Sequence, residues 1–187
     1  EVWFDVAERE GASEFTGYSA TSGKGRVVAV VKGGAEIASA SQGDEVIVLV
    51  NQTPFYGESG GQAGDTGTIS SADGLRLAVS DTAKPLGRLH AHHANVAAGT
   101  IKVGDTVHLE VDTTRRDAIR ANHSATHLLH AALRNRLGAH VTQKGSAVAA
   151  DRLRFDFSQP VALTPEDIAA VEAEVNAEIR ANDPVVT

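Results

Sequence analysis

The spacing of apolar residues along the chain changes near residue 112. Before this point, short apolar stretches are separated by glycine, aspartate and serine, as in a series of short strands joined by tight turns. After it, apolar residues recur every three or four positions, which is the period of a helix. The pattern therefore predicts a β-rich part over residues 1–112 and an α+β part over residues 113–187.

Two kinds of strand are predicted in the first part. Residues 46–50 form a continuous apolar run after a Gly-Asp turn, which is typical of a strand buried on both faces. Residues 106–111 alternate between apolar and polar, so one face is buried and the other is wet. Further short strands are expected at 26–32, 67–69, 75–80 and 87–94. Strands at this spacing favour a small closed β-barrel.

The second part is predicted to hold two helices and two strands. The first helix starts at Asp112 or Thr113 and ends before Gly138, and the second is capped by Thr164 and limited by Pro184. Strands are expected at 140–149 and 152–158, and another beginning at 184–187. The buried faces of the two helices are assigned to Ile119, Leu129, Leu133 and Leu137, and to Ile168, Val171, Val175 and Ile179. We therefore expect an antiparallel sheet with helices packed on one side, and an α+β fold class overall.

Composition narrows the class of protein. No run of about 18 apolar residues exists, and the N-terminus lacks the basic and apolar regions of a signal peptide. The absence of cysteine excludes disulfides and thiolate ligands, and it weakly favours a cytoplasmic location. Because the chain contains no methionine, we expect it to be a piece of a longer protein.

Charge is distributed unevenly along the chain. The net charge of −7 argues against binding nucleic acid through overall basicity. Residues 113–158 nevertheless carry a net charge of +5, from Arg115, Arg116, Arg120, Arg134, Arg136, Lys144, Arg152 and Arg154 against Asp117, Asp151 and Asp156. This stretch suits either a phosphate-bearing substrate or a solvated face with ordinary ion pairs.

A glycine-rich segment lies between Thr53 and Gly67. From Gly57 on, it has five glycines in eleven residues, which suits a loop that lets a ligand or another chain approach its backbone. It lacks the endings of the known phosphate-binding loops. A barrel corner with tight turns is the alternative interpretation, and we favour it on physical grounds alone.

Two histidines stand four residues apart in the first predicted helix. His123 and His127 project from one helix face, which suits the binding of one transition-metal ion. A catalytic zinc normally has three protein ligands and a water, and no obvious third ligand follows at comparable spacing. His130 shares the same face, but we favour a hydrogen bond to a neighbouring strand for it.

The remaining histidine group is His90, His92 and His93. On paper these residues resemble a metal cluster, but in an alternating strand His93 points away from the other two. We therefore favour a solvated strand edge.

Four blocks together resemble the editing region of the alanyl-tRNA synthetase family. They are Thr53-Pro-Phe-Tyr56 with Glu58-Ser-Gly-Gly-Gln62, then Asn122-His-Ser-Ala-Thr-His-Leu-Leu-His130, Val141-Thr-Gln-Lys-Gly-Ser146 and Leu153-Arg-Phe-Asp-Phe-Ser158. Free-standing proteins that deacylate mischarged alanine tRNA share the later blocks but begin close to the first. Some fifty residues precede that block here, including Phe15-Thr-Gly-Tyr18, so an internal synthetase fragment is favoured.

The resemblance implies a fold, a reaction and a site. The fold would be that of the editing domains of threonyl- and alanyl-tRNA synthetases. The reaction would be hydrolysis of seryl- or glycyl-tRNA(Ala) within an enzyme that attaches alanine to tRNA(Ala) with ATP. His123 and His127 match metal ligands for zinc, and Thr126 and Gln143 match pocket residues, which we name as candidate catalytic residues. The family's other two ligands lie in a downstream Cys-x-x-x-His motif that this chain does not reach, so we expect weak or no zinc binding by the chain alone.

The implied partners are the acceptor end of tRNA(Ala) and the remainder of the synthetase, with no membrane. Arg120, Lys144, Gly60, Gly61 and Gln62 are candidate contacts for the substrate or the tRNA. Water would be activated by the metal ion or by a neighbouring ribose hydroxyl, and both routes stay open. The alternatives are a free-standing editing protein and a non-catalytic module that positions the tRNA acceptor end. Inactivity of the isolated fragment also stays open.

Overall fold

The computed structural model describes residues 1–184, which divide into two compact units. The first unit contains residues 1–59 and 63–116, and the second contains residues 60–62 and the chain from residue 117 on. The division thus falls four residues after the predicted boundary, and three residues of the glycine-rich segment belong to the second unit. Of the strand expected at 184–187, residues 185–187 lie outside the described part of the chain.

Most of the strands come before helix α2, and the two that follow it precede helix α3. In sequence they are α1 (Val2–Glu10), β1 (Glu14–Phe15), β2 (Ser22–Lys32), β3 (Ala35–Ile37), β4 (Ser39–Ser41), β5 (Glu45–Val50), β6 (Gln52–Thr53), β7 (Gly67–Ser70), β8 (Arg76–Ala83), η1 (Pro85–Gly87), β9 (Ala91–Ala98), β10 (Thr100–Lys102), β11 (Thr106–Val111), α2 (Thr113–Leu137), β12 (Gln143–Val148), β13 (Leu153–Phe157) and α3 (Pro165–Ala181). In the described part of the chain, no helix combines the length and apolar character needed to cross a lipid bilayer.

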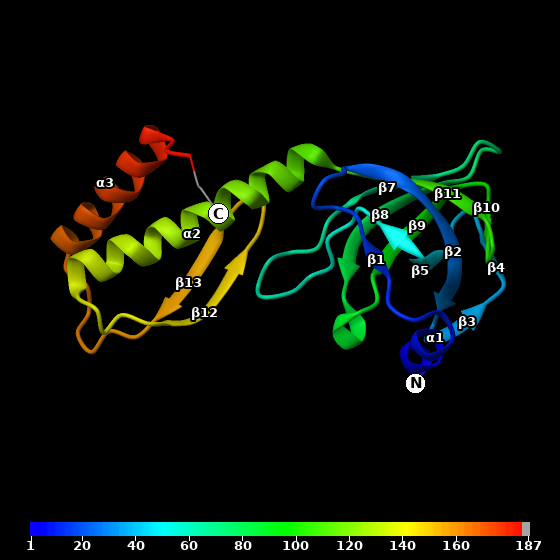
Figure 1. Cartoon of the computed structure of the whole chain (residues 1–187), viewed down its shortest axis with the longest axis horizontal. Coiled ribbons are helices and arrows are strands. Elements are labelled where there is room, and N and C mark those ends of the chain that lie inside the picture. Colours follow the sequence, from blue (N-terminus) through cyan, green and yellow to red (C-terminus); the bar gives the residue numbers. More distant parts are fainter. Residues whose placement is uncertain (185–187) are drawn as a thin grey trace. The chain divides into compact units, whose positions relative to one another are not determined.

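The first unit is a closed antiparallel barrel (Figure 1). Its strands follow one another around the wall in the order β11-β7-β8-β9-β5-β2, and pairing of β11 with β2 closes the ring. Valine, leucine and isoleucine side chains from all six strands fill the interior, together with Phe55. The barrel predicted from the spacing of short strands is therefore present.

Helix α1, which the apolar pattern did not predict, covers one outer face of this barrel. Its Val6 and Ala7 are buried against Val28, Val31 and Leu49 on the outer side of β2 and β5. In β5, alternate residues such as Val48 point inward into the barrel core. The continuous apolar run of β5 is thus buried on both faces, as predicted, because a helix covers the side that would otherwise face water.

One predicted barrel strand begins in the wrong place. Residues 87–94 were expected to be extended, but Pro85–Gly87 form a short helical turn and β9 begins only at Ala91. Positive φ angles of 56° at Leu86 and 67° at Gly87 make the turn that precedes the strand. The strand predicted at 75–80 begins one residue before β8, the other predicted barrel strands lie within observed strands, and β11 has the predicted bounds.

Of the three histidines predicted to lie on a solvated edge, His90 and His92 are instead buried, and His93 is half-buried. Strand β9 lies inside the barrel wall between β8 and β5, so it has no free edge. The His92 ring is fully buried, with Nδ1 donating to the Val48 carbonyl at 2.8 Å and Nε2 accepting from Thr53 Oγ1 at 2.8 Å. Burial lowers the pKa of His92 and of His90 from 6.5 to about 4.

A buried ion pair anchors the start of the glycine-rich segment in the barrel unit. Arg116 contacts the Asp65 carboxylate and the Pro54 carbonyl, and its Nη1 donates to the Gly17 carbonyl at 3.3 Å. The same carboxylate accepts from the backbone N–H of Tyr56 at 2.8 Å. Both charges are thereby compensated by several hydrogen bonds, which is the condition for a stable buried pair.

The second unit consists of the hairpin β12–β13 with helices α2 and α3 (Figure 1). Phe155 and Phe157 share one face of β13 and pack with Leu133 of α2 and Val171 of α3. Arg154 and Asp156 lie on the other face as an exposed ion pair. Helices packed on one side of an antiparallel sheet were predicted, and this unit has that arrangement.

Details of the second unit differ from the prediction. The first strand begins at Gln143 rather than at residue 140, because a turn between Gly138 and Val141 occupies the residues before it. On α3, Ile168 and Ile179 were assigned to the buried face, but they are 55% and 51% exposed. The start of this helix is as predicted, since Thr164 caps it in a capping box with Asp167.

Candidate active site

A small pocket lies within the second unit, between α2, the hairpin and the loop of residues 60–62. Its cavity volume is about 220 Å³. The lining residues are Gly60, Gln62, His123, Thr126, His127, His130, Gln143, Ser146, Val148 and Phe155. Sites for drug-sized ligands usually measure about 300–1,000 Å³, so this cavity suits a group of only a few heavy atoms.

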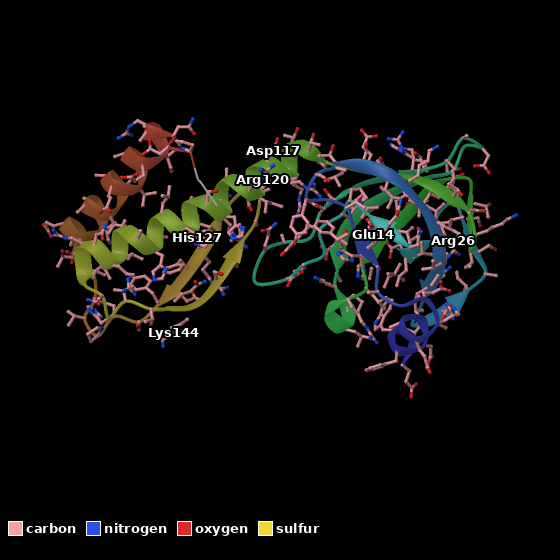
Figure 2. All side chains as sticks on the ribbon, in the orientation of Figure 1. Glu14, Arg26, Asp117, Arg120, His127 and Lys144 are labelled. Carbon is pink, nitrogen blue, oxygen red and sulfur yellow. The ribbon has the colours of Figure 1, made fainter. Side chains whose placement is uncertain are left out.

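Helix α2 places the histidine pair on the pocket. His123 and His127 are one helical turn apart, their ring centroids are 5.2 Å apart, and both side chains are exposed. Figure 2 shows His127 on the side of α2 nearest the hairpin. Two imidazoles can supply two of the three or four protein ligands that zinc requires. Within residues 1–184 no group of three or more histidine, aspartate or glutamate side chains is arranged to hold a metal ion.

Thr126 lies between the two histidines in sequence and is buried. Its hydroxyl donates a hydrogen bond to the Asn122 carbonyl of the same helix at 2.8 Å. The hydroxyl proton is therefore used within the helix, and Oγ1 can offer only lone pairs to a ligand. A group that binds there must be a donor, such as a hydroxyl or an ammonium group.

The hairpin supplies Gln143 at the start of β12. It is exposed and lines the pocket. Asn122 of α2 fixes the far end of the hairpin, because its side-chain amide donates to the carbonyls of Ala149 at 2.8 Å and Ala150 at 3.2 Å.

The loop of residues 60–62 forms the third wall by pairing with the hairpin. The Gly61 carbonyl accepts from the Val148 N–H at 2.8 Å, and Gln62 pairs with Val148 as a parallel bridge. Gly61 has φ +85°, and a Cβ on it would lie 2.4 Å from the Ser146 carbonyl oxygen. Only glycine fits this contact. At Gly61 it is thus the hairpin of the same chain that approaches the backbone, whereas the predicted approach of a ligand or another chain stays a prediction.

His130 occupies the pocket next to Phe155 of β13. The two ring centroids are 5.2 Å apart and the planes are tilted by 40°. Nε2 of His130 is buried and has no hydrogen-bond partner in the described structure. The predicted hydrogen bond from His130 to a neighbouring strand is therefore wrong, because the strand presents an aromatic ring at that position.

Three of the candidate contact residues do not line the pocket. Lys144 lies on β12 and Arg120 lies on α2 before the pocket residues (Figure 2). Gly61 belongs to the loop of residues 60–62 but is not among the residues that line the cavity. Arg120 is 74% exposed and sits 3.9 Å from Asp117. Other basic residues of this stretch form closer ion pairs, such as Arg136 with Asp167 at 2.8 Å. The interpretation as a solvated face with ordinary ion pairs thus applies to much of this stretch.

The described residues that line the pocket carry no carboxylate, lysine or arginine. Their polar groups are imidazoles, hydroxyls and amides, which bind by hydrogen bonds or as metal ligands. The sequence blocks contained Ser146 and Phe155, and Val148 lay in the strand predicted at 140–149, but no role was assigned to these three residues. Their position on the hairpin opposite α2 was the missing information, since it depends on the packing of the unit and not on local spacing.

Comparison with known proteins places the chain in a family. A model of the family described as tRNA synthetases class II (A) matches residues 1–115, which end before the pocket residues of α2. The chain is 67% identical over 187 residues to the alanine–tRNA ligases of Sphingopyxis alaskensis and Rhizorhabdus wittichii. It is 56% identical over 186 residues to the alanine–tRNA ligase of Granulibacter bethesdensis. All of this chain is covered in each comparison, and it spans 21% of the length of each relative. Because the family match covers more than half of its residues, this chain belongs to the class II (A) family of tRNA synthetases.

Proposed function

We propose that this chain is part of an alanine–tRNA ligase and that its second unit hydrolyses seryl- and glycyl-tRNA(Ala) formed in error. The observation that carries the proposal is the pocket, where His123, His127, Thr126 and Gln143 converge on a cavity of about 220 Å³. A cavity of this size suits an amino acid of two or three carbons. The identity of 67% to alanine–tRNA ligases supports the choice of tRNA(Ala).

Such a correction has a physical reason. A synthetic site shaped for alanine cannot firmly exclude glycine, which is smaller, or serine, which adds only a hydroxyl. A second pocket that accepts these two and releases alanine would restore accuracy. Hydrolysis adds the hydroxyl of water to the acyl carbon, and the ribose oxygen leaves with a proton.

Four of the pocket residues have a proposed role in holding the aminoacyl end. Thr126 Oγ1 accepts a hydrogen bond from the ammonium or hydroxyl group of the amino acid, since its own proton is used within α2. Gln143 can donate to or accept from the ester or the amino acid. The loop residues Gly60 and Gln62 close the side of the cavity opposite the helix.

We further propose that His123 and His127 are two ligands of a zinc ion whose other ligands lie beyond residues 1–184. A bound zinc ion would lower the pKa of its water to about 7. A neighbouring ribose hydroxyl is the other candidate for activating water. The described residues that line the cavity include no carboxylate or lysine that could act as a base.

The test uses the complete protein encoded by the gene, charged seryl-tRNA(Ala), and the double variant His123→Ala, His127→Ala. We expect hydrolysis of seryl-tRNA(Ala) to be lost while attachment of alanine continues. The matched control is His108→Ala, a partly exposed histidine on barrel strand β11, which should leave both activities unchanged. Zinc content, measured on the same samples, should fall only in the double variant.

Two outcomes would contradict the proposal. Persistent hydrolysis in the double variant would show that the histidine pair is not part of the reaction. Binding of the tRNA acceptor end by the wild-type protein, without turnover of either mischarged substrate, would instead favour a positioning module.

A further inference from the structure

His130 is the pocket residue whose chemistry the roles above do not use. It lies on α2, three residues after His127, and lines the same cavity. Its Nε2 is shielded from solvent and lacks a hydrogen-bond partner within residues 1–184. A buried polar atom without a partner is rare in folded proteins and destabilising, so such an atom usually marks a place where a ligand or water binds.

The neighbours of His130 in the described structure make no hydrogen bond to Nε2. Phe155 presents only carbon atoms, with its ring centroid 5.2 Å from that of His130. The Thr126 hydroxyl donates its proton to Asn122 and not to the ring. The content of the cavity can therefore supply the partner that Nε2 lacks.

We propose that His130 determines specificity by hydrogen bonding, through Nε2, to a polar group that occupies the cavity. The inference rests on the proposed function, under which that group belongs to the amino acid. A serine side chain brings a hydroxyl to the ring, and glycine leaves room for a water that does the same. Alanine places a methyl group there, which displaces water and leaves Nε2 unpaired.

The size of the effect follows from the cost of an unpaired buried group. Leaving Nε2 unsatisfied lowers the affinity of the cavity for an alanyl group by roughly tenfold. A cavity of about 220 Å³ holds roughly seven waters at ~30 Å³ each, so a glycyl group and a bridging water fit together. The selectivity for serine and glycine over alanine would thus come from a hydrogen-bonding group that lines the cavity and not from the size of the cavity.

The test compares His130→Leu with His130→Gln in the complete protein. Leucine has a similar bulk but no polar atom, whereas the terminal amide of glutamine reaches the position of Nε2. The measurement is kcat/KM for hydrolysis of seryl-tRNA(Ala) and of alanyl-tRNA(Ala). We expect His130→Leu to lower the ratio of serine to alanine hydrolysis by roughly tenfold, and His130→Gln to restore most of it.

A ratio unchanged in His130→Leu would overturn the inference, as would loss of zinc from this variant, since the ring would then be a metal ligand. If the wild-type protein hydrolyses neither substrate, the proposed function fails separately. In that case the ¹⁵N resonance of His130 Nε2 is followed during titration with amide-linked seryl-adenosine and alanyl-adenosine. A shift with the seryl compound alone supports the role of His130, and equal responses to both compounds refute it.

Discussion

Replacing Gly61 by alanine should detach the loop of residues 60–62 from the hairpin without unfolding the second unit. In the native structure the Gly61 carbonyl accepts from the Val148 N–H at 2.8 Å. A Cβ at position 61 would lie 2.4 Å from the Ser146 carbonyl oxygen, where ordinary contacts begin at 3.4 Å. The loop would have to move by about 1.0 Å, the difference between these distances, and the hydrogen bond to Val148 would be strained or lost.

The free-energy cost of the clash alone can be measured with Gly60→Ala as a matched control. Both glycines have positive φ, +58° at Gly60 and +85° at Gly61, so both variants carry left-handed strain of about 1–2 kcal/mol. Only Gly61→Ala adds the clash, because a Cβ on Gly60 meets nothing within 4 Å. Overpacking of this kind costs about 1–3 kcal/mol, and the middle of this range lies above the ~0.5–1.5 kcal/mol of one backbone hydrogen bond. The loop should therefore separate.

Hydrogen exchange at the Val148 amide measures this separation directly. At 1.4 kcal/mol for each factor of ten, the amide should exchange roughly 5- to 150-fold faster in Gly61→Ala than in Gly60→Ala. Amides of Leu133 and Ala132 in the centre of α2 should keep their protection in both variants. Equal exchange rates at Val148 in the two variants would refute the reasoning, because the contact with Ser146 would then carry no energetic consequence.

Three further predictions concern the rest of the chain. Arg116→Met should destabilise the barrel unit by about 3–5 kcal/mol, because it leaves the Asp65 carboxylate buried and unpaired. Arg120→Met, at the exposed pair with Asp117, should cost less than about 1 kcal/mol. Urea unfolding of both variants measures this difference. Acidification should also weaken the barrel. Burial lowers the pKa of His92 from 6.5 to about 4, so its contribution to the free energy of unfolding is complete above pH 6.5, and about 3 kcal/mol is lost as the pH falls to 4. Between pH 7, 5 and 4, the free energy of unfolding should fall less steeply with pH in His92→Gln than in the wild type. Finally, Thr164→Ala removes the cap of α3 and should lower stability by about 1 kcal/mol in thermal unfolding, and an unchanged midpoint would contradict that role.

Local pattern was enough to place the elements that carry their own signals. Helix α2 has a cap, a period and a terminal glycine, and both of its ends were predicted. Strand β11 alternates cleanly and was predicted with its bounds. The histidine pair followed from the same helical period, so the sequence alone could indicate that the two rings share a face.

The features that could not be predicted depend on which helices and strands pack against one another. Only Val6 and Ala7 of α1 are buried, and this is too short a stripe to stand out among charged neighbours. His92 has the polarity of an edge residue but lies inside the wall, where Thr53 and Val48 satisfy both ring nitrogens. Ile168 and Ile179 continue the apolar period of α3, yet no described element covers them.

The pocket itself was predicted in part. His123, Thr126, His127 and Gln143 were named from sequence and line one cavity. The environment of His130 was not foreseen, because the ring of Phe155 reaches it only through the pairing of the hairpin with α2.

The bridge between Gln62 and Val148 joins residues 86 positions apart in the sequence. This separation affects when the pocket can form during folding and whether the second unit can be produced without the first. During synthesis from the N-terminus, the loop leaves the ribosome long before its partner strand exists, so this wall can form only as a late, non-local step. The same bridge limits modularity. A protein trimmed to start at Asp117 would keep both helices and the hairpin, yet its cavity would be open on the side that Gly60 and Gln62 now close. The residues that complete the pocket are thus inherited from a part of the sequence that otherwise builds the barrel.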